Sequence, residues 1–426
     1  MPNRRATLLK PADVLAPGAL VREQVALMVV VAVTLFVRIA FISTLRNEYY
    51  FADTVEYRAN ALEMLAGRVL DPSTPRAPVF PAFLAIGYAL FGLDNFLALR
   101  LMQLVLSVAL VLAGVSLGRR VGGPAIGILT GLGIALSPTL VFSNGLLYPT
   151  TLYTLLLLCV TLGAWSLAEK PSLLKGLGLG VALALGILTD QVMAAPGAAV
   201  FGWLAWQARR GGRAVLFATL LAVATTGVIT ELYVRSQSSP ETGEAPFVGK
   251  AQWTLWYART DVTMRDDRRI QFPLGTEFHP LPAKQFLARE WNYVKTRPLD
   301  YAHDFAFEFL HFYWPEVDRL QTTNRFTTRN VRLVGAVHFW PVLVFAMVGL
   351  AAGLAKRRDR ALLILVSAAT AAFYSLFFTQ TRYRIPIEPQ MTLLAALGFE
   401  RLWPGLSRWI ASGSSGASGA SLPHRD

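Results

Sequence analysis

Residues 24–45 read QVALMVVVAVTLFVRIAFISTL, an apolar run in which Arg38 is the only charged residue. A helix needs about 20 apolar residues to cross the hydrocarbon core of a bilayer, so this run predicts a first transmembrane helix. Further runs of the same kind follow along the chain. Together they predict about ten transmembrane helices, at 24–45, 96–118, 122–141, 149–168, 173–189, 191–207, 213–233, 332–355, 361–379 and 385–403.

The composition of the whole chain agrees with this pattern. Of its 426 residues, 54% are hydrophobic and only 16% are charged, and the mean hydropathy is +0.44. Soluble globular chains carry about a quarter charged residues, and a chain this apolar cannot stay solvated as a disordered polymer. The sequence therefore predicts an all-α polytopic membrane protein and excludes a set of soluble domains.

The net charge of +13 at pH 7 comes largely from Lys and Arg in short segments between the apolar runs. Orientation signals and anionic headgroups place basic residues there, so the charge favours a membrane over nucleic acid. The basic N-terminus precedes a long run without a clear cleavage site, which predicts a retained first helix rather than a signal peptide. The single cysteine, Cys159, excludes a disulfide framework.

One apolar stretch, Val79–Phe91, is too short to span a bilayer, and we expect it to form an interfacial helix. With the N-terminus in the cytoplasm, every short basic loop then falls on the cytoplasmic side, as the positive-inside rule requires. If this stretch crossed instead, the later basic loops would all move outside. The predicted divisions are a cytoplasmic segment 1–23, a catalytic transmembrane module 24–234 with a first outer loop 46–91, an outer loop region 235–330, C-terminal transmembrane helices 331–403 and a disordered cytoplasmic tail 404–426.

The second outer region has a mixed character. Residues 236–249 are rich in Ser, Pro and Gly and predict a loop, whereas residues 283–314 have helical periodicity with many aromatic side chains. Aromatic residues at that spacing are typical of a helix at the level of the lipid headgroups. Because the cytoplasmic loops are too short to hold a catalytic domain, we expect any chemistry on the outer face.

The first outer loop contains the charged residues that point to chemistry. Asp53 is followed by Glu56 and by Tyr57 at helical spacing, and Arg76 precedes the Pro-flanked stretch. A carboxylate near a cation is the arrangement needed to take a proton from an acceptor hydroxyl beside a lipid phosphate leaving group. An acidic residue at a membrane surface is also commonly just solvated, so Asp53 alone leaves both readings open.

Two longer motifs, one in this loop and one near the C-terminal end of the chain, help to interpret these charged residues. They are RAPVFPAFLAIGYALFG at residues 76–92 and RYRIPIEPQMTLLAALG at residues 382–398. With Asp53 after the first span and Tyr57 four residues later, the pattern resembles the polyprenyl-phosphate-sugar-dependent glycosyltransferases of the GT-C superfamily. The likeness is to the branch of protein mannosyltransferases and lipid A aminoarabinose transferases, and it extends over residues 22–402.

The resemblance implies an inverting hexosyl- or pentosyltransferase in a bacterial inner membrane, with its active site facing the periplasm or cell exterior. Its donor is a single sugar on a polyprenyl phosphate, and its acceptor is an envelope glycolipid, polysaccharide or protein. In this chain the catalytic carboxylate of the family corresponds to Asp53. The residues that the resemblance places at the donor phosphate or sugar are Tyr57, Arg76, Arg382, Tyr383 and Arg384. A snorkelling anchor at a helix end is the competing explanation for the last two arginines.

The chain departs from the family at Thr150, where many relatives carry an acidic residue at the start of the fourth span. Asp190 is a candidate replacement, although a helix N-cap explains it equally well. Glu56 and Arg38 are possible supporting residues, the latter because a charge inside a span is a functional candidate by default. The histidines are too scattered for a zinc site, so we expect no obligatory metal or other cofactor.

Other functions remain open at this point. Trp253, Trp256 and Tyr257 are expected to cover the sugar or, alternatively, to anchor the loop at the membrane interface. A transporter or flippase for a lipid-linked sugar commonly carries ionisable groups at mid-membrane, which this chain mostly lacks. A glycan ligase or polymerase commonly relies on one large late outer loop. Because of Thr150, a catalytically silent relative is a further alternative.

Overall fold

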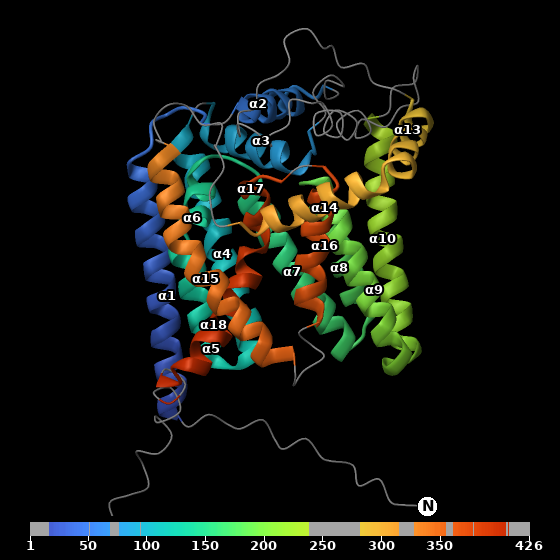
Figure 1. Ribbon diagram of the computed structural model, residues 1–426. Helices are drawn as coiled ribbons and strands as arrows, with labels where there is room; N and C mark the ends of the chain where they lie inside the picture. The colour runs from blue at the N-terminus through green and yellow to red at the C-terminus, as the bar shows by residue number, and fades with distance from the viewer. Residues whose placement is uncertain are drawn as a thin grey trace, which may run out of the picture.

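The computed structural model describes residues 17–50, 52–68, 76–93, 95–237, 282–314, 328–354, 361–377, 379–405 and 408. Every regular element in these residues is helical, and no strand occurs among them. The elements, labelled as in Figure 1, are α1 (Pro17–Ser43), α2 (Ala52–Leu65), α3 (Val79–Phe91), α4 (Phe96–Gly122), α5 (Pro124–Leu136), α6 (Pro138–Gly145), α7 (Thr150–Glu169), α8 (Leu173–Ile187), the 3₁₀ turn η1 (Gln191–Met193), α9 (Ala194–Gly211), α10 (Arg213–Gln237), α13 (Ala283–Thr296), α14 (Pro298–Phe312), α15 (Thr328–Leu354), α16 (Ala361–Ser375), α17 (Thr381–Arg384), the 3₁₀ turn η3 (Ile385–Ile387) and α18 (Glu388–Leu402). The predicted all-α membrane architecture is confirmed.

The long helices stand side by side and alternate in direction (Figure 1). Among the described residues, five helices are long and apolar enough to cross a membrane: α1, α4, α7, α10 and α15. The pair α5 and α6, bent by 54°, makes a sixth when it is counted as one span. The predicted number of ten is therefore not confirmed. The remaining runs form shorter helices such as α8 and α16, or begin with a 3₁₀ turn, as before α18, where Pro386 cannot donate a backbone bond.

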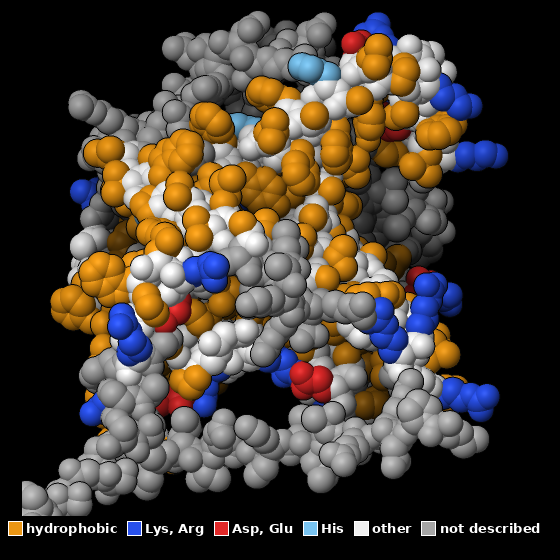
Figure 2. Space-filling view, turned by 60° about the horizontal axis from the view of Figure 1, so that its bottom comes forward, with side chains coloured by type: hydrophobic (Ala, Val, Ile, Leu, Met, Phe, Trp, Pro, Cys, Tyr) orange, Lys and Arg blue, Asp and Glu red, His pale blue; other side chains and the backbone are white. Residues whose placement is uncertain are grey.

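The turns between α4 and α5, α7 and α8, and α9 and α10 lie together at the lower end of the bundle in Figure 1, which we call the basic end. Lys and Arg side chains gather around this end, next to a surface that is mostly hydrophobic (Figure 2). Arg119 of α4 pairs with Glu23 of α1 at 2.8 Å, and Arg120 pairs with Glu169 of α7. The basic turns that the structure describes after α4, α7 and α9 thus occupy one end of the bundle.

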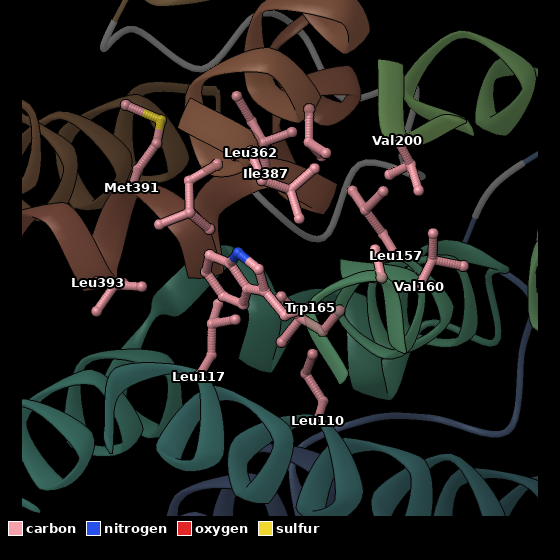
Figure 3. Close-up of a cluster of buried hydrophobic side chains, with 14 of the residues drawn as sticks. Leu110, Leu117, Leu157, Val160, Trp165, Val200, Leu362, Ile387, Met391 and Leu393 are labelled. Atoms are coloured by element: carbon pink, nitrogen blue, oxygen red, sulfur yellow. The ribbon is translucent and has the colours of Figure 1, made fainter. Parts of the chain in front are cut away.

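The hydrophobic core lies between α4, α7, α9, α16 and α18 (Figure 3). Its side chains, among them Leu117, Trp165 and Leu362, are almost completely buried. Large apolar side chains on the outside of the bundle, such as Phe36 of α1, are exposed, as expected for a surface that faces lipid. The helices α15 and α18 approach most closely at Gly349, where an added Cβ would lie 1.9 Å from the Leu394 carbonyl oxygen.

The junction between α5 and α6 explains the charge inside the first span. Pro138 begins α6 and cannot donate a backbone hydrogen bond, so the last carbonyls of α5 lose their helical partners. The fully buried Arg38 donates to two of them, Ala135 O at 2.8 Å and Ile134 O at 3.2 Å, and also to the hydroxyl of Ser107. Arg38 therefore stabilises the broken helix and lies outside the candidate site described below.

At the end opposite the basic end, α2 and α3 lie across the bundle, and we call this the α2/α3 end (Figure 1). The predicted interfacial stretch is α3, and its Val79 N–H donates to Leu188 O at 3.0 Å, which joins it to the end of α8. The helices α13 and α14 occupy the region where helical periodicity was predicted. The aromatic residues Trp253, Trp256 and Tyr257 lie outside the described residues, as does most of the predicted tail.

Candidate active site

Asp53 lies in the first turn of α2, at the α2/α3 end, where three other parts of the chain reach its carboxylate. Arg76, just before α3, places Nη2 at 3.2 Å from Oδ1. The hydroxyl of Tyr148, in the turn between α6 and α7, donates to Oδ2 at 3.0 Å, and Arg382 Nη1 of α17 lies 3.9 Å from the same oxygen. Two of the residues that the sequence associates with donor binding therefore flank the predicted catalytic carboxylate.

Arg76 is held from three sides. Its Nε lies 2.5 Å from Glu56 Oε2, and its guanidinium stands over the ring of Tyr57 at 5.2 Å from the ring centre. Burial alone would lower the pKa of Arg76, but Tyr57, the hydrogen bond to Glu56 and the charge of Asp53 together raise it above its usual value. Arg76 is thus permanently charged and aimed at Asp53. The supporting role of Glu56 stays a prediction; the structure shows its carboxylate at Arg76.

Tyr57 lies beneath Arg76 rather than at the surface. Its ring packs edge-on against Phe80 and against Tyr148, with centroid distances of 5.2 and 5.8 Å. Burial raises the pKa of Tyr57, so the hydroxyl stays protonated. The residue therefore supports the two side chains that reach Asp53, and direct contact with a donor stays a prediction.

Arg382 enters the site from the other side and is surrounded by aromatic rings. Its guanidinium lies 6.0 Å from the ring centre of Tyr148 and 5.3 Å from that of Tyr383. Tyr383 in turn stacks on Tyr374 of α16, with ring centroids 4.4 Å apart and an angle of 4° between the planes. Burial would lower the pKa of Arg382, but Tyr148, Tyr383 and Asp53 raise it, so this side chain is also permanently charged.

Arg384 is two residues further on and makes a different set of contacts. It is fully buried, donates to Trp314 O and stands 3.5 Å from the ring centre of Phe339. Its Nε lies 3.6 Å from Glu388, whose carboxylate also accepts from the hydroxyls of Ser137 and Thr139. The structure thus brings Arg382 to Asp53 and places Arg384 in a polar cluster at the start of α18.

Asp190, just before η1, and Thr150, at the start of α7, lie near this site. Asp190 is the N-cap of η1 and accepts from Val192 N at 3.2 Å, as the capping explanation predicts. Its charge nevertheless reaches Tyr57, where it adds to the effect of burial on the pKa. Thr150 is the first residue of α7. The side chain that reaches Asp53 from this turn is Tyr148, two residues earlier, which the sequence analysis did not single out.

The site is partly shielded from the surroundings. The side chains of Asp53, Arg76 and Arg382 are 25%, 12% and 18% exposed, so they are reachable although mostly covered by protein. A carboxylate held between two permanent cations stays ionised, which is the form that can accept a proton, and the cations are placed to bind an anion beside it. Among the described residues, no group of three or more His, Cys, Asp or Glu is placed to hold a metal ion.

Comparisons with known proteins show what the sequence and the fold resemble. Residues 74–233 match the family model described as dolichyl-phosphate-mannose-protein mannosyltransferase. No match was found among curated protein sequences. The structure of ArnT from Cupriavidus metallidurans in the apo state is similar, with a TM-score of 0.57, 18% identity, 91% of this chain covered and 62% of that chain covered.

Two further structures have the same fold. ArnT bound to undecaprenyl phosphate gives a TM-score of 0.54 at 17% identity, covering 93% of this chain and 63% of that one. The apo oligosaccharyltransferase from Archaeoglobus fulgidus gives a TM-score of 0.54 at 15% identity, covering 92% and 52%. This chain therefore spans about three fifths of ArnT and about half of the oligosaccharyltransferase. The predicted resemblance to the GT-C glycosyltransferases is confirmed.

Proposed function

We propose that this protein is an inverting glycosyltransferase that moves a single sugar from a polyprenyl phosphate to a hydroxyl of an envelope acceptor. The observation that carries the proposal is the position of Asp53, with its carboxylate between Arg76 and Arg382. The family match over residues 74–233 and the shared fold with two kinds of sugar transferase support it.

In the proposed reaction, one carboxylate oxygen of Asp53 takes the proton of the acceptor hydroxyl. The acceptor oxygen attacks the anomeric carbon from the face opposite the phosphate, and the bond between that carbon and the phosphate oxygen breaks. Inversion follows from this direction of attack. The phosphate gains negative charge as it leaves, and Arg76 and Arg382 stabilise that charge in a partly dry site.

A polyprenyl phosphate suits the two arginines and their place at one end of the bundle. The planar guanidinium makes two charge-assisted bonds to a phosphate, and the neighbours of both guanidiniums raise their pKa above the usual value, so both stay charged. The ArnT structure bound to undecaprenyl phosphate supports this class of donor by likeness of fold. The prenyl chain would lie along the apolar outer surface of the helices. Tyr383, which stacks on Tyr374, is the proposed platform for the sugar.

The proposed orientation of the protein in the membrane rests on the distribution of its basic residues. The basic end, with Arg119, Arg120, Arg209, Arg210 and Arg213, is the cytoplasmic end by the positive-inside rule. The α2/α3 end then faces the periplasm or cell exterior of a bacterium, where envelope glycolipids, polysaccharides and proteins are accessible. The structure of the Archaeoglobus fulgidus oligosaccharyltransferase tethered to an acceptor peptide supports a protein acceptor by likeness of fold.

A mass profile of envelope glycans tests the proposal. Cells expressing the wild type are compared with cells expressing Asp53→Asn at equal protein levels, and Glu63→Gln on the same helix is the matched control. We expect one glycan to lose a single sugar in Asp53→Asn cells and to keep it in Glu63→Gln cells. Identical profiles in all three strains would refute the transferase and favour a transporter or a silent relative.

A further inference from the structure

The helix α4 carries two buried polar side chains one turn apart that reach away from their own helix. Arg100 donates from Nε to Gly145 O at 3.1 Å and from Nη2 to Arg46 O at 2.6 Å. Gln103 donates from Nε2 to Tyr148 O at 2.9 Å. Both side chains are at most 2% exposed.

These bonds join the two segments that lead into the candidate site. Arg46 lies in the connection from α1 to α2, and the first turn of α2 carries Asp53. The Arg46 backbone N–H donates to the hydroxyl of the buried Tyr50 at 2.7 Å. Gly145 ends α6 and begins the turn that carries Tyr148. One guanidinium therefore bonds to both backbone segments, and Gln103 adds a third bond at the residue whose hydroxyl meets Asp53.

The turn that α4 holds has a strained backbone. Leu147 has φ of +52°, the one residue other than glycine with positive φ in the described part of the chain, and its side chain is 1% exposed. A residue of this size is uncommon in the left-handed region and stays there only when its surroundings hold it. Tyr148 follows it directly, so release of this backbone would move the hydroxyl.

We propose that Arg100 and Gln103 are positioning residues that hold the Tyr148 hydroxyl and the Asp53 carboxylate together, so that the acceptor proton meets a fixed oxygen. This inference rests on the proposed function of Asp53. A lysine at position 100 keeps the charge but has no planar fork with which to bond two carbonyls in fixed directions. Misplacement of a catalytic group by about 1 Å costs up to roughly 10²-fold in rate.

The kinetic test measures transfer by the purified full chain in detergent or lipid. We expect Gln103→Leu and Arg100→Lys each to lower kcat about 10-fold or more, with the donor KM changed less than about twofold, because both side chains are buried and bond to backbone carbonyls. Ser116→Ala is the matched control, because this α4 hydroxyl bonds only to Leu112 O of its own helix. An increase in KM with unchanged kcat would overturn the positioning role.

A double-mutant cycle separates positioning from general weakening of the fold. If Gln103 acts through Tyr148, then Gln103→Leu has its full effect in the wild type and little further effect on Tyr148→Phe. Equal effects in both backgrounds would show a role unconnected with Tyr148 and overturn the proposal.

A measurement that does not depend on transfer activity tests the positioning role separately from the proposed function. Hydrogen exchange should become faster in both variants in peptides covering residues 45–50 and 145–149, and stay unchanged in α7 and α10. Unchanged exchange would overturn the inference even if Asp53 proves catalytic. Faster exchange together with an inactive wild type would locate the failure in the proposed function instead.

Discussion

Two segments far apart in the chain meet at Asp53 and present their charged side chains in different ways. In α2, Asp53, Glu56 and Tyr57 are spaced so that they share one helix face, and all three contribute to the site around Arg76. In α17, Arg382 and Arg384 are two residues apart, which is about 200° around a helix. The first reaches Asp53, whereas the second bonds to Trp314 O.

The contrast shows that two residues of the same type, two positions apart on a helix, can have different roles because they point to different sides of the helix. Arg382 is partly exposed and its neighbours are aromatic rings around a carboxylate. Arg384 is completely enclosed and its partner carboxylate, Glu388, is enclosed as well. We therefore expect changes at Arg382 to affect transfer and changes at Arg384 to affect folding.

The largest effect, a loss of folding stability, is expected for Arg384→Leu. Removal of this cation leaves the Glu388 carboxylate buried without its ion-pair partner. Loss of one partner of a buried ion pair lowers the free energy of unfolding by about 3–5 kcal/mol. Thermal unfolding in detergent should show a much lower midpoint or too little folded protein to measure. The double variant Arg384→Leu with Glu388→Gln should recover part of the loss, because no charge stays buried alone. A normally stable Arg384→Leu protein with impaired transfer would reverse the two roles.

Arg382→Leu should lower the rate of transfer and leave the stability of the protein nearly unchanged. Loss of a group that stabilises transition-state charge typically costs about 10²–10³-fold in rate, and the midpoint of thermal unfolding should change little because Asp53 keeps its ion pair with Arg76 and is itself partly exposed. Arg382→Lys, which keeps the charge without the fork, should retain an intermediate rate. The assay is transfer from a synthetic polyprenyl-phosphate sugar. Full activity of Arg382→Leu would remove α17 from the proposed site.

The same comparison shows what the sequence could predict. Apolar runs predicted the long helices, prolines marked the start of α3, and the spacing of Asp53 and Tyr57 predicted that both lie on one helix, which is α2. These features depend on short-range periodicity. The positions of Arg384 and Tyr148 depend on packing between helices distant in sequence, such as the bond from Tyr148 to Asp53. Periodicity contains no information about such contacts, so Tyr148 was missed and both arginines were assigned to the donor.

A smaller loss of stability and of transfer rate is expected from a change at Thr379, where α14 bonds to the segment that leads into α17. Thr379 donates its backbone N–H to Glu308 Oε2 at 2.7 Å, and its hydroxyl contacts the same oxygen at 2.6 Å and His311 Nδ1 at 3.0 Å. Thr379→Val keeps the shape and the backbone bond but removes the hydroxyl. We expect about 1–3 kcal/mol of lost stability from the unpaired groups, and a transfer rate reduced less than in Arg382→Leu. Thr370→Val, whose hydroxyl bonds only within α16, is the control.

The smallest effect is expected for Glu56→Gln, on the α2 side. The Glu56 side chain is 41% exposed and its ion pair with Arg76 is therefore weakened by solvent. Glutamine can still accept a hydrogen bond from Arg76, and Asp53 continues to hold the other end of the guanidinium. We expect kcat within about fivefold of the wild type and a donor KM that is unchanged or lower, because Glu56 and the donor phosphate both bind Arg76. A loss as large as that of Asp53→Asn would mean that α2 supplies two essential carboxylates, and that helical spacing on this face predicted Glu56 as well as Asp53.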